Sequence, residues 1–464
     1  MFKVHLLDPD ESRWSTADNP SKSKSYKTSQ LAAAICYQPT LKMAVDKAKN
    51  IDINGKVWPS GHLTTTQHAR NHMTFLLDNI PISLVTFGLH LAHPFYNTSQ
   101  RSGRYCTDMF NTDYNWLCQL FISKFTNIPA KSPEAVKLCK WVDEGVTYFK
   151  HALPGVTAKV LAEIKRTRPN YRGNYDTLAL KMAQEQLRGI ISTIFPTGLA
   201  YTINVSTLVG MAETAWNEPL RALLLRMVAV ANLRGLVSPD IVANKHKNLM
   251  DWVPAFDSYS AYGVNTPMVK LQQPGPYGGT NFLRMTDRLD KIQCNTPVNR
   301  LPFSPKTNFI TDEVSTTLYS SVEVSVATFG QDQRHRTISR GNPSVTGGMY
   351  VSPILDADHG QFFVDHMGEY LEMAKGQTAD LIHFIPYGAV VSYAKESEIR
   401  AFHHEMHKRL CWNAQDEIRL LAEGTVRGIS PTNSAVFGPP CQSEGKCYEK
   451  TPCGRMTKKS AQEE

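Results

Sequence analysis

The chain has 464 residues, 42% hydrophobic and 20% charged, a balance that excludes a wholly disordered or fibrous protein. Its formal net charge of +8 suits acidic or phosphorylated ligands, although a solvated basic surface explains that charge equally well. Apolar residues never run uninterrupted for about 18 positions, so we expect no membrane span. The nine cysteines are mostly scattered singly, and the N-terminal sequence lacks a signal-peptide pattern, so we expect a cytoplasmic protein with reduced thiols.

The predicted elements alternate between strands and helices. Apolar, β-branched residues predict strands near 81–87 and 322–329. A helix is expected from Pro133 to about 153, because proline is favoured at the first helical position. Helical spacing of apolar residues predicts another helix over 362–375. These elements indicate an α/β (α+β) fold, a mixed sheet with flanking helices.

Two parts of the chain share a set of markers in the same order. The markers pair Thr86-Phe87-Gly88 with Thr328-Phe329-Gly330, His93 with His335, Ser102 with Ser344, and Trp216-Asn217 with Trp412-Asn413. The first three pairs have one constant offset, and each Trp-Asn precedes a helical pattern. We therefore predict two tandem copies of one domain, over 1–253 and 281–464, joined by a turn-rich linker at 254–280.

The sharpest local motif is Arg334-His335-Arg336, followed after seven residues by Ser344. Two guanidinium groups can hold a phosphate or an anionic ring, although a solvated basic turn is equally compatible with the triplet alone. In the first copy, Ser102-Gly103-Arg104 places a hydroxyl, an open backbone and a guanidinium together, which can cradle a phosphate. His62 and Thr64 follow a glycine turn and add two polar side chains.

These motifs resemble those of the flavin-dependent thymidylate synthases. Arg-His-Arg, seven residues and then serine is similar to that family's signature, and residues 61–105 resemble the same region in the first copy. The copies depart from the family in opposite ways: the first has Ala92-His93-Pro94 for Arg-His-Arg, and the second has Thr346 for the last arginine. Family sites form between subunits of a homotetramer. The resemblance therefore implies composite sites between the two halves, and a homodimer that forms a pseudo-tetramer.

The resemblance also implies roles for individual residues. It gives catalytic roles to Ser102, Arg104, Arg334 and Arg409. It gives substrate binding to Gln331, Arg334, Ser102, Gly103, Arg104, Arg188 and Arg409. It gives flavin binding to His62, Thr64, Asn204, Arg334, His335, Arg336 and Arg400.

The implied reaction is methylation of dUMP at C5 to give dTMP. Methylenetetrahydrofolate supplies the carbon, reduced FAD supplies the hydride, and NADPH is the usual reductant of the flavin. One alternative is a related flavoenzyme that modifies another pyrimidine nucleotide, for example by hydroxymethylation. A second is a non-catalytic binder of nucleotide or nucleic acid, although the motifs favour a pyrimidine nucleotide over nucleic acid, and no membrane partner is expected.

The C-terminal cysteines are a separate feature. Cys441, Cys447 and Cys453 have five residues between each neighbouring pair. Structural zinc sites usually use four ligands, often in close Cys-x-x-Cys pairs. The spacing therefore favours a loop of reduced thiols over a metal site, and a metal site with a fourth ligand such as His407 is the alternative.

Overall fold

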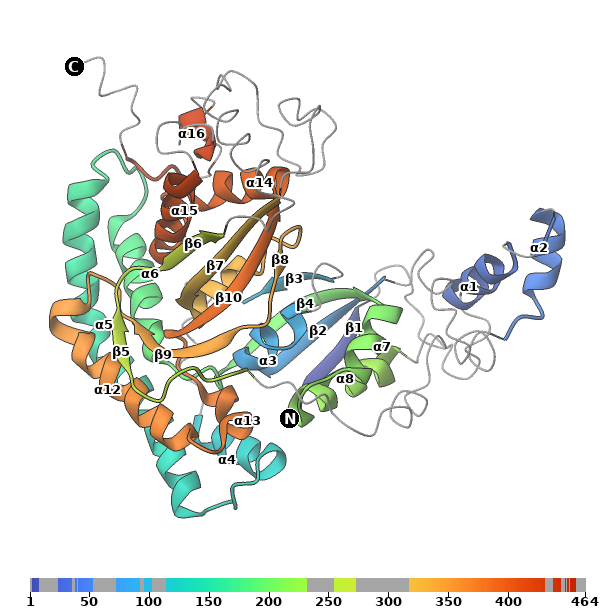
Figure 1. Ribbon diagram of the computed structural model, residues 1–464, viewed down its shortest axis with the longest axis horizontal. Helices are drawn as coiled ribbons and strands as arrows, with labels where there is room; N and C mark the ends of the chain where they lie inside the picture. The colour runs from blue at the N-terminus through green and yellow to red at the C-terminus, as the bar shows by residue number, and fades with distance from the viewer. Residues whose placement is uncertain are drawn as a thin grey trace. The chain divides into compact units, whose positions relative to one another are not determined.

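The computed structural model describes residues 2–7, 24–35, 38–39, 41–52, 72–91, 96–101, 114–231, 254–272, 317–429, 437–443, 447, 449 and 451–455. The chain divides into two compact units, each with its own β-sheet (Figure 1). Unit 1 consists of Met1–Ser102, Leu120–Pro129 and Ile194–Val253. Unit 2 consists of Gly103–Gln119, Ala130–Thr193 and Pro254–Glu464. The division between the units falls within helix α4 (Tyr114–Phe125).

Unit 1 is built on a four-stranded antiparallel sheet. Its strands, in spatial order, are β1 (Lys3–Leu7), β2 (His72–Pro81), β4 (Pro196–Asn204) and β3 (Tyr96–Gln100). Its helices are α1 (Lys24–Ile35), α2 (Leu41–Ala48), α3 (Ile82–Thr86), the 3-10 turn η4 (Leu89–Leu91), α7 (Val205–Glu213) and α8 (Glu218–Ala231). Two buried aromatic side chains join these elements through hydrogen bonds to backbone carbonyls. The Tyr201 hydroxyl donates to the Leu89 carbonyl at 2.8 Å, and the Trp216 indole donates to the Phe87 carbonyl at 2.7 Å.

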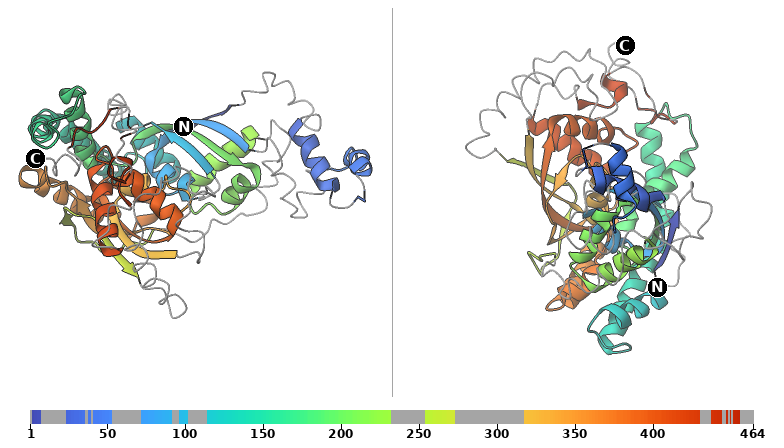
Figure 2. Two further views of the ribbon diagram at one scale, coloured as in Figure 1. Left: turned by 90° about the horizontal axis from the view of Figure 1, so that it is seen from above. Right: turned by 90° about the vertical axis from the view of Figure 1, so that its right-hand side faces the viewer.

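Unit 2 is built on a larger mixed sheet. Its main strands, in spatial order, are β5 (Tyr262–Val264), β9 (Ser344–Tyr350), β10 (Ala389–Glu398), β7 (Thr317–Ser325) and β6 (Met268–Gln272). The short β8 (Ser339–Arg340) also pairs with β10, and β5 is parallel to β9 while the other pairings are antiparallel. Its helices are α5 (Pro133–Thr167), α6 (Tyr175–Leu187), η6 (Arg188–Ile190), α11 (Val326–Asp332), α12 (Asp356–Ala374), α13 (Thr378–Leu381), η9 (Ile382–Phe384), α14 (Ile399–Arg409), α15 (Asp416–Ile429) and α16 (Pro440–Ser443). Helices α14 and α15 pack on one another, and they contact β10 and β6 respectively (Figure 2).

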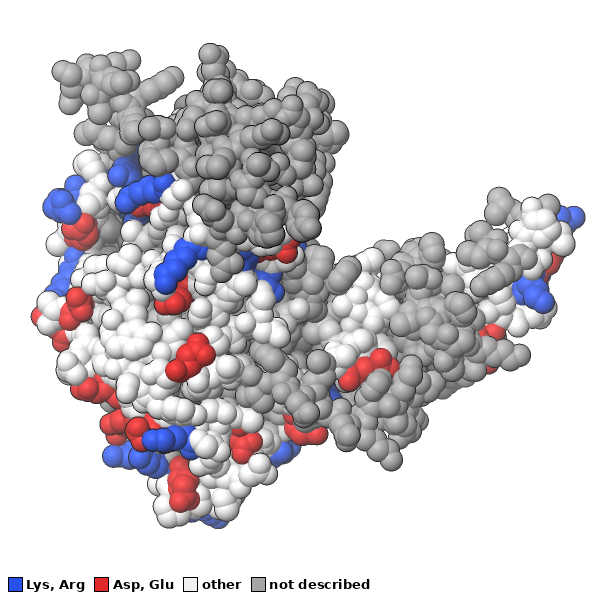
Figure 3. Space-filling model, in the orientation of Figure 1, with Lys and Arg blue, Asp and Glu red and all other residues white. Residues whose placement is uncertain are grey.

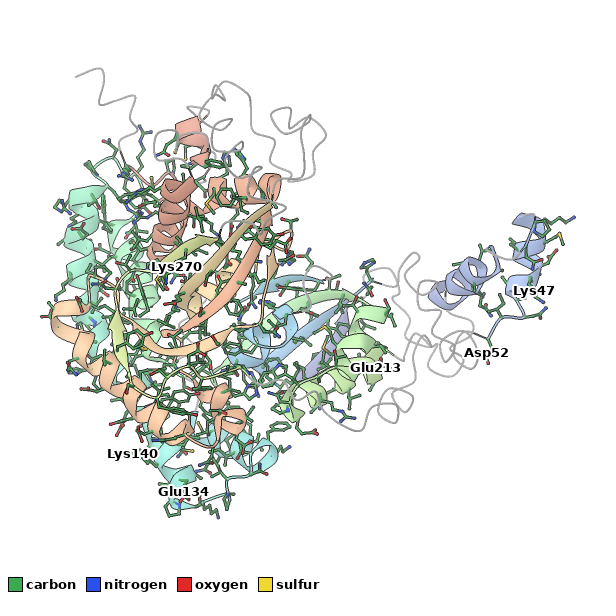
Figure 4. All side chains as sticks on the ribbon, in the orientation of Figure 1. Lys47, Asp52, Glu134, Lys140, Glu213 and Lys270 are labelled. Carbon is green, nitrogen blue, oxygen red and sulfur yellow. The ribbon has the colours of Figure 1, made fainter. Side chains whose placement is uncertain are left out.

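Two predicted helices are confirmed. Helix α5 begins at Pro133, where the Ser132 hydroxyl accepts a hydrogen bond from the Ala135 amide at 3.2 Å. Glu134 lies in its first turn, where an acidic side chain interacts favourably with the helix dipole (Figure 4). The helix continues to Thr167, well beyond the predicted end at 153, because a stripe of buried apolar residues continues along it. The helix predicted at 362–375 corresponds to α12.

The two predicted strands are partly wrong. Strand β2 ends at Pro81, and residues 82–86 form helix α3. Strand β7 ends at Ser325, whose hydroxyl accepts from the Thr328 amide at 3.1 Å and so starts α11. Residues 82–86 and 326–329 are all buried, and a short buried run with no exposed face does not distinguish helix from strand by its periodicity.

The two sheets share one order of elements. In each, an edge strand pairs with a second strand, which pairs with the central strand, as in β1-β2-β4 and β6-β7-β10. A short helix follows the second strand directly, α3 in unit 1 and α11 in unit 2. Two helices follow the central strand, α7 and α8 or α14 and α15.

The compact units do not follow the expected boundaries of 1–253, 254–280 and 281–464. Helices α5 and α6 come from the first half of the sequence but belong to unit 2, where α5 packs against α12. The expected linker supplies β5 and β6, both of which pair within the sheet of unit 2. Short edge strands in a turn-rich segment carry too few residues to show a clear alternating pattern. Across the described segments, no helix is long and apolar enough to cross a membrane.

The core of unit 2 contains two buried histidines that should make it sensitive to acid. His366 stacks on Trp141 with ring centroids 4.3 Å apart, and burial lowers the pKa of its imidazole to about 3. Burial also lowers the pKa of His383 to about 3. Since an unfolded histidine titrates near 6.5, each contributes stability that is present above pH 6.5 and is lost as the pH falls toward 3.

We expect the unfolding free energy to fall by about 1.4 kcal/mol per pH unit for each of the two histidines between pH 6 and pH 4. In the variant His366→Phe, an aromatic ring still faces Trp141, but the titrating group is gone. Urea unfolding monitored by circular dichroism should show a correspondingly shallower dependence on pH. An unchanged slope would contradict the assignment to His366.

Candidate functional site

Polar residues from distant parts of the sequence meet in unit 2. An Arg409 Nη donates to the carbonyl oxygen of Gln331 at 2.5 Å. The Gln331 amide contacts the side chain of Gln415, and Arg188 donates to the Gln415 Oε1 at 3.5 Å. Three residues expected to bind substrate, Arg188, Gln331 and Arg409, are therefore brought together, and Gln415 is their common neighbour.

Local backbone contacts fix the position of Arg188. It opens η6, immediately after α6, and its side chain is buried with the guanidinium 5.2 Å from the centre of the Tyr387 ring. The Gly388 amide donates to the Gly189 carbonyl at 2.7 Å, and the Tyr387 amide donates to the Ile191 carbonyl at 2.8 Å. A Cβ at Gly388 would lie 3.0 Å from the Gly189 carbonyl oxygen, so glycine allows this close approach. The chain after α6 is therefore held against the chain entering β10.

The Arg-His-Arg segment forms the turn that follows α11. The Arg334 and His335 amides donate to the carbonyls of Gln331 and Asp332, both at 3.1 Å. Arg334 is exposed, while His335 and Arg336 are half-buried. Burial, reinforced by the charge of Arg409, holds the pKa of His335 well below its usual value. The imidazole is therefore neutral at neutral pH, and the two arginines carry the charge of this segment.

Buried charged residues lie next to this turn. Both oxygens of Asp332 are used, since Arg340 donates to Oδ2 at 2.6 Å and Lys395 to Oδ1 at 2.9 Å. Lys395 also donates to both oxygens of Glu405 at 2.8 Å, and the Tyr393 hydroxyl donates to Asp332 at 2.8 Å. Burial opposes the charge of Asp332, but Arg340 and Lys395 outweigh it and lower the pKa of this carboxyl. We refer to Asp332, Arg340, Tyr393, Lys395 and Glu405 as the buried charge cluster.

The site carries donors suited to an anion. The Nε atoms of Arg188 and Arg409 are buried and have no hydrogen-bond partner among the described residues. Guanidinium groups with unused donors fit phosphate or the anionic part of a flavin. Within the same described ranges, no group of three or more His, Cys, Asp or Glu side chains is arranged to hold a metal ion. On the described surface in Figure 3, both charge signs are interspersed, so the buried arginines are the more specific indication of a ligand.

A cavity of about 730 Å³ lies near these residues in unit 2, a size suited to a small organic ligand. Its lining comes from α5, α6, residues 352–354 and α15. Gln186 and Asp416 border it and are joined by a hydrogen bond of 3.1 Å. Gln186 is two residues before Arg188, and Asp416 directly follows Gln415, so the cavity and the arginine site share their supporting elements.

Other predicted site residues are not part of this arrangement. Ser102, Gly103, Arg104, His62 and Thr64 lie outside the described residues. Asn204 belongs to unit 1, where its side-chain oxygen accepts from the Thr207 amide and the Ser206 hydroxyl, both at 2.8 Å, and caps α7. Arg400 lies in the first turn of α14, and its side chain is not described.

Two residues of the site were missed by the sequence analysis. Gln415 directly precedes α15, and its polar side chain at a helix start was the available signal. Tyr387 lies just before β10 and had no signal beyond being a single aromatic residue among apolar ones.

Comparison with known families adds an independent observation about the first half of the chain. Residues 21–219 match the family model described as thymidylate synthase complementing protein. This segment is similar to that family. The expected resemblance is thereby confirmed for the segment that contains Arg188, Asn204 and the Ser102-Gly103-Arg104 motif.

The match to this family model ends at residue 219, before β7, so the Arg-His-Arg segment lies outside it. Among solved structures, the chain is similar to a UMP/dUMP methylase, PolB from Streptomyces cacaoi, bound with 5-Br UMP. The two are 15% identical, the alignment covers 38% of this chain and 96% of that chain, and the TM-score is 0.26. A search among curated protein sequences finds no match.

Proposed function

We propose that this chain is a flavin-dependent enzyme that methylates dUMP at C5 to give dTMP. The observation that carries the proposal is the meeting of Arg188 with Gln331 and Arg409 around Gln415. Arg188 belongs to the segment that matches the thymidylate synthase complementing family, whereas the other residues come from the second half. If each of two fused copies has lost the motif that the other keeps, a complete site must take residues from both halves of the sequence.

We further propose that the chain is a tandem duplication whose copies complete one another's sites. The shared order of strands and helices in the two sheets supports this. So does the inclusion of α5, α6 and η6, from the first half, in unit 2. By analogy with the family's homotetramers, two chains would associate as a homodimer, a pseudo-tetramer with four domain copies. Such an enzyme would work in the cytoplasm.

The described residues have defined tasks in this proposal. Arg188 and Arg409 bind the nucleotide through its phosphate and stabilise the negative charge that develops on the uracil ring. Ser102, Gly103 and Arg104 complete the phosphate site. The neutral His335 positions ligands and carries no charge of its own.

FAD would be held by Arg334, His335 and Arg336, and the family resemblance also assigns flavin binding to His62, Thr64, Asn204 and Arg400. When bound and reduced, it supplies the hydride, NADPH restores its reduced state, and methylenetetrahydrofolate provides the carbon. The cationic donors of the Arg-His-Arg segment fit the anionic pyrimidine end of a reduced flavin.

The first test is the visible spectrum of the purified protein, before and after addition of FAD and desalting. We expect a retained flavin band that NADPH bleaches faster when dUMP is present. Product analysis with methylenetetrahydrofolate should then give dTMP. A protein that retains no flavin under any condition would overturn the proposal and favour a non-catalytic nucleotide or nucleic-acid binder.

A second candidate is a related flavoenzyme that acts on another pyrimidine nucleotide or adds a hydroxymethyl group. The departures from the family motifs at residues 92–94 and 346, and the long insert over about 111–176, favour it. Parallel reactions with dUMP and dCMP, analysed by mass spectrometry, distinguish the two. A product 30 mass units heavier, about one CH₂O, would indicate hydroxymethylation, whereas methylation adds about 14.

A further inference from the structure

Arg340 makes several contacts with the backbone that precedes it. Its guanidinium donates to the carbonyl oxygens of Asp332 at 2.5 Å, His335 at 3.0 Å and Ile338 at 2.9 Å. A further bond of 2.6 Å joins its Nε to the Asp332 carboxylate. These three carbonyls lie before, within and after the Arg-His-Arg turn. One side chain therefore ties the whole turn together.

Arg340 is itself held firmly. It lies on β8, in register with Lys395 of the central strand β10. Its side chain is only 5% exposed, and that of Asp332 is fully buried. Burial disfavours its charge, but the carboxylate of Asp332 outweighs this and raises the pKa of Arg340 above its ordinary value. The guanidinium is therefore charged at every pH at which the protein folds.

The composition of the buried charge cluster indicates more than a role in stability. It contains two cations, Arg340 and Lys395, and two carboxyl groups, Asp332 and Glu405, all nearly removed from water. Buried ion pairs contribute little net stability compared with well-packed apolar side chains, but they require defined geometry. In this cluster, the defined geometry is that of the segment with Arg334 and Arg336.

We propose that Arg340 is a positioning residue for the Arg-His-Arg segment. Its guanidinium fixes the turn at three carbonyls, so that Arg334 and Arg336 present their charges in one arrangement to an anionic ligand. The part of this inference that concerns the ligand rests on the proposed function. The part that concerns the turn does not, so the two can be tested separately.

The test uses the full chain with the substitution Arg340→Lys. Lysine retains the charge beside Asp332, but its single ammonium group cannot reproduce the planar, multiple donation of arginine. Hydrogen–deuterium exchange of peptides spanning 331–340 reports the turn, because the Arg334, His335 and Ile338 amides are hydrogen-bonded within it. We expect exchange at least about tenfold faster in this segment, with α12 unchanged. We also expect kcat/KM for dUMP and affinity for FAD to fall about tenfold or more.

Arg427→Lys is the matched control, because that guanidinium lies on the same unit, is 76% exposed and pairs with Glu423 at 3.6 Å. Unchanged exchange over 331–340 in Arg340→Lys would overturn the proposal. Faster exchange in a protein whose wild type has no methylating activity would support the positioning of the turn while the proposed function fails. If Arg340→Lys does not fold, Arg340→Gln, which keeps one donor and removes the charge, is measured in the same way.

Discussion

Replacing Arg188 by alanine is expected to lower kcat/KM for the proposed methylation of dUMP about 100- to 1000-fold. The guanidinium is buried between Gln415 and the Tyr387 ring, and its Nε has no partner among the described residues. A buried cation with an unused donor is suited to a phosphate, and losing a charge-assisted bond in such a place costs about 2–5 kcal/mol. The measurement is steady-state dTMP formation as a function of dUMP concentration.

Arg172→Ala is the matched control for Arg188→Ala. Arg172 precedes α6 in the same unit and is exposed, so its loss should leave the kinetics within about twofold. Arg188→Lys should recover only part of the activity, because an ammonium group does not provide the paired donors of a guanidinium. Activity of Arg188→Ala near that of the wild type would remove the residue from the site.

Replacing Lys395 by methionine is expected to lower the free energy of unfolding by about 3–5 kcal/mol. Lys395 is 8% exposed and bonds to both Asp332 and Glu405, so its loss leaves two buried carboxyl groups with Arg340 as the nearby cation. The measurement is urea unfolding at pH 7 by circular dichroism. The surface substitution Glu423→Gln, which removes partially exposed ion pairs, should change the unfolding free energy by less than about 1 kcal/mol.

Glu405, the partner of Lys395, should affect the stability in a way that depends on pH. Burial raises the pKa of Glu405 to about 7, above its ordinary 4.5, although Lys395 acts in the opposite direction. A carboxyl whose pKa is raised on folding contributes stability that is present below pH 4.5 and is lost as the pH rises through 7. Glutamine does not titrate. The unfolding free energy of Glu405→Gln should therefore rise, relative to that of the wild type, as the pH increases from 5 to 8. A relative loss over that range would contradict the raised pKa.

The sequence was most informative where a local signal had one meaning. Pro133 predicted the start of α5 because proline suits the first position of a helix. The Arg-His-Arg motif led to the family later matched over residues 21–219, although the motif lies outside that segment. The family resemblance gave substrate-binding roles to Arg188, Gln331 and Arg409 one by one, and these three residues lie together in unit 2.

The sequence could not show structural features that depend on contacts between residues far apart in the chain. Ile82–Thr86 resembles a strand because it is rich in apolar and β-branched side chains, and its helical form depends on burial from every side. The pairing of Asp332 with Lys395 joins residues 63 positions apart, and nothing in either local sequence indicates it. The assignment of α5 and α6 to unit 2 is a property of tertiary packing, which the repeat of markers along the chain does not reveal.

The discontinuity of unit 2 has a consequence for biosynthesis. Helices α5 and α6 are complete once residue 187 has been made, but their partners in the same unit extend to α15, which ends at Ile429. At ordinary rates of translation, the ribosome needs roughly 10–50 s to make the intervening chain. During that interval Trp141 of α5 lacks the rings of His366 and Tyr370, against which it packs in the folded unit. We therefore expect the folding yield of this chain to depend on chaperones that shield exposed apolar helices more than its size alone suggests.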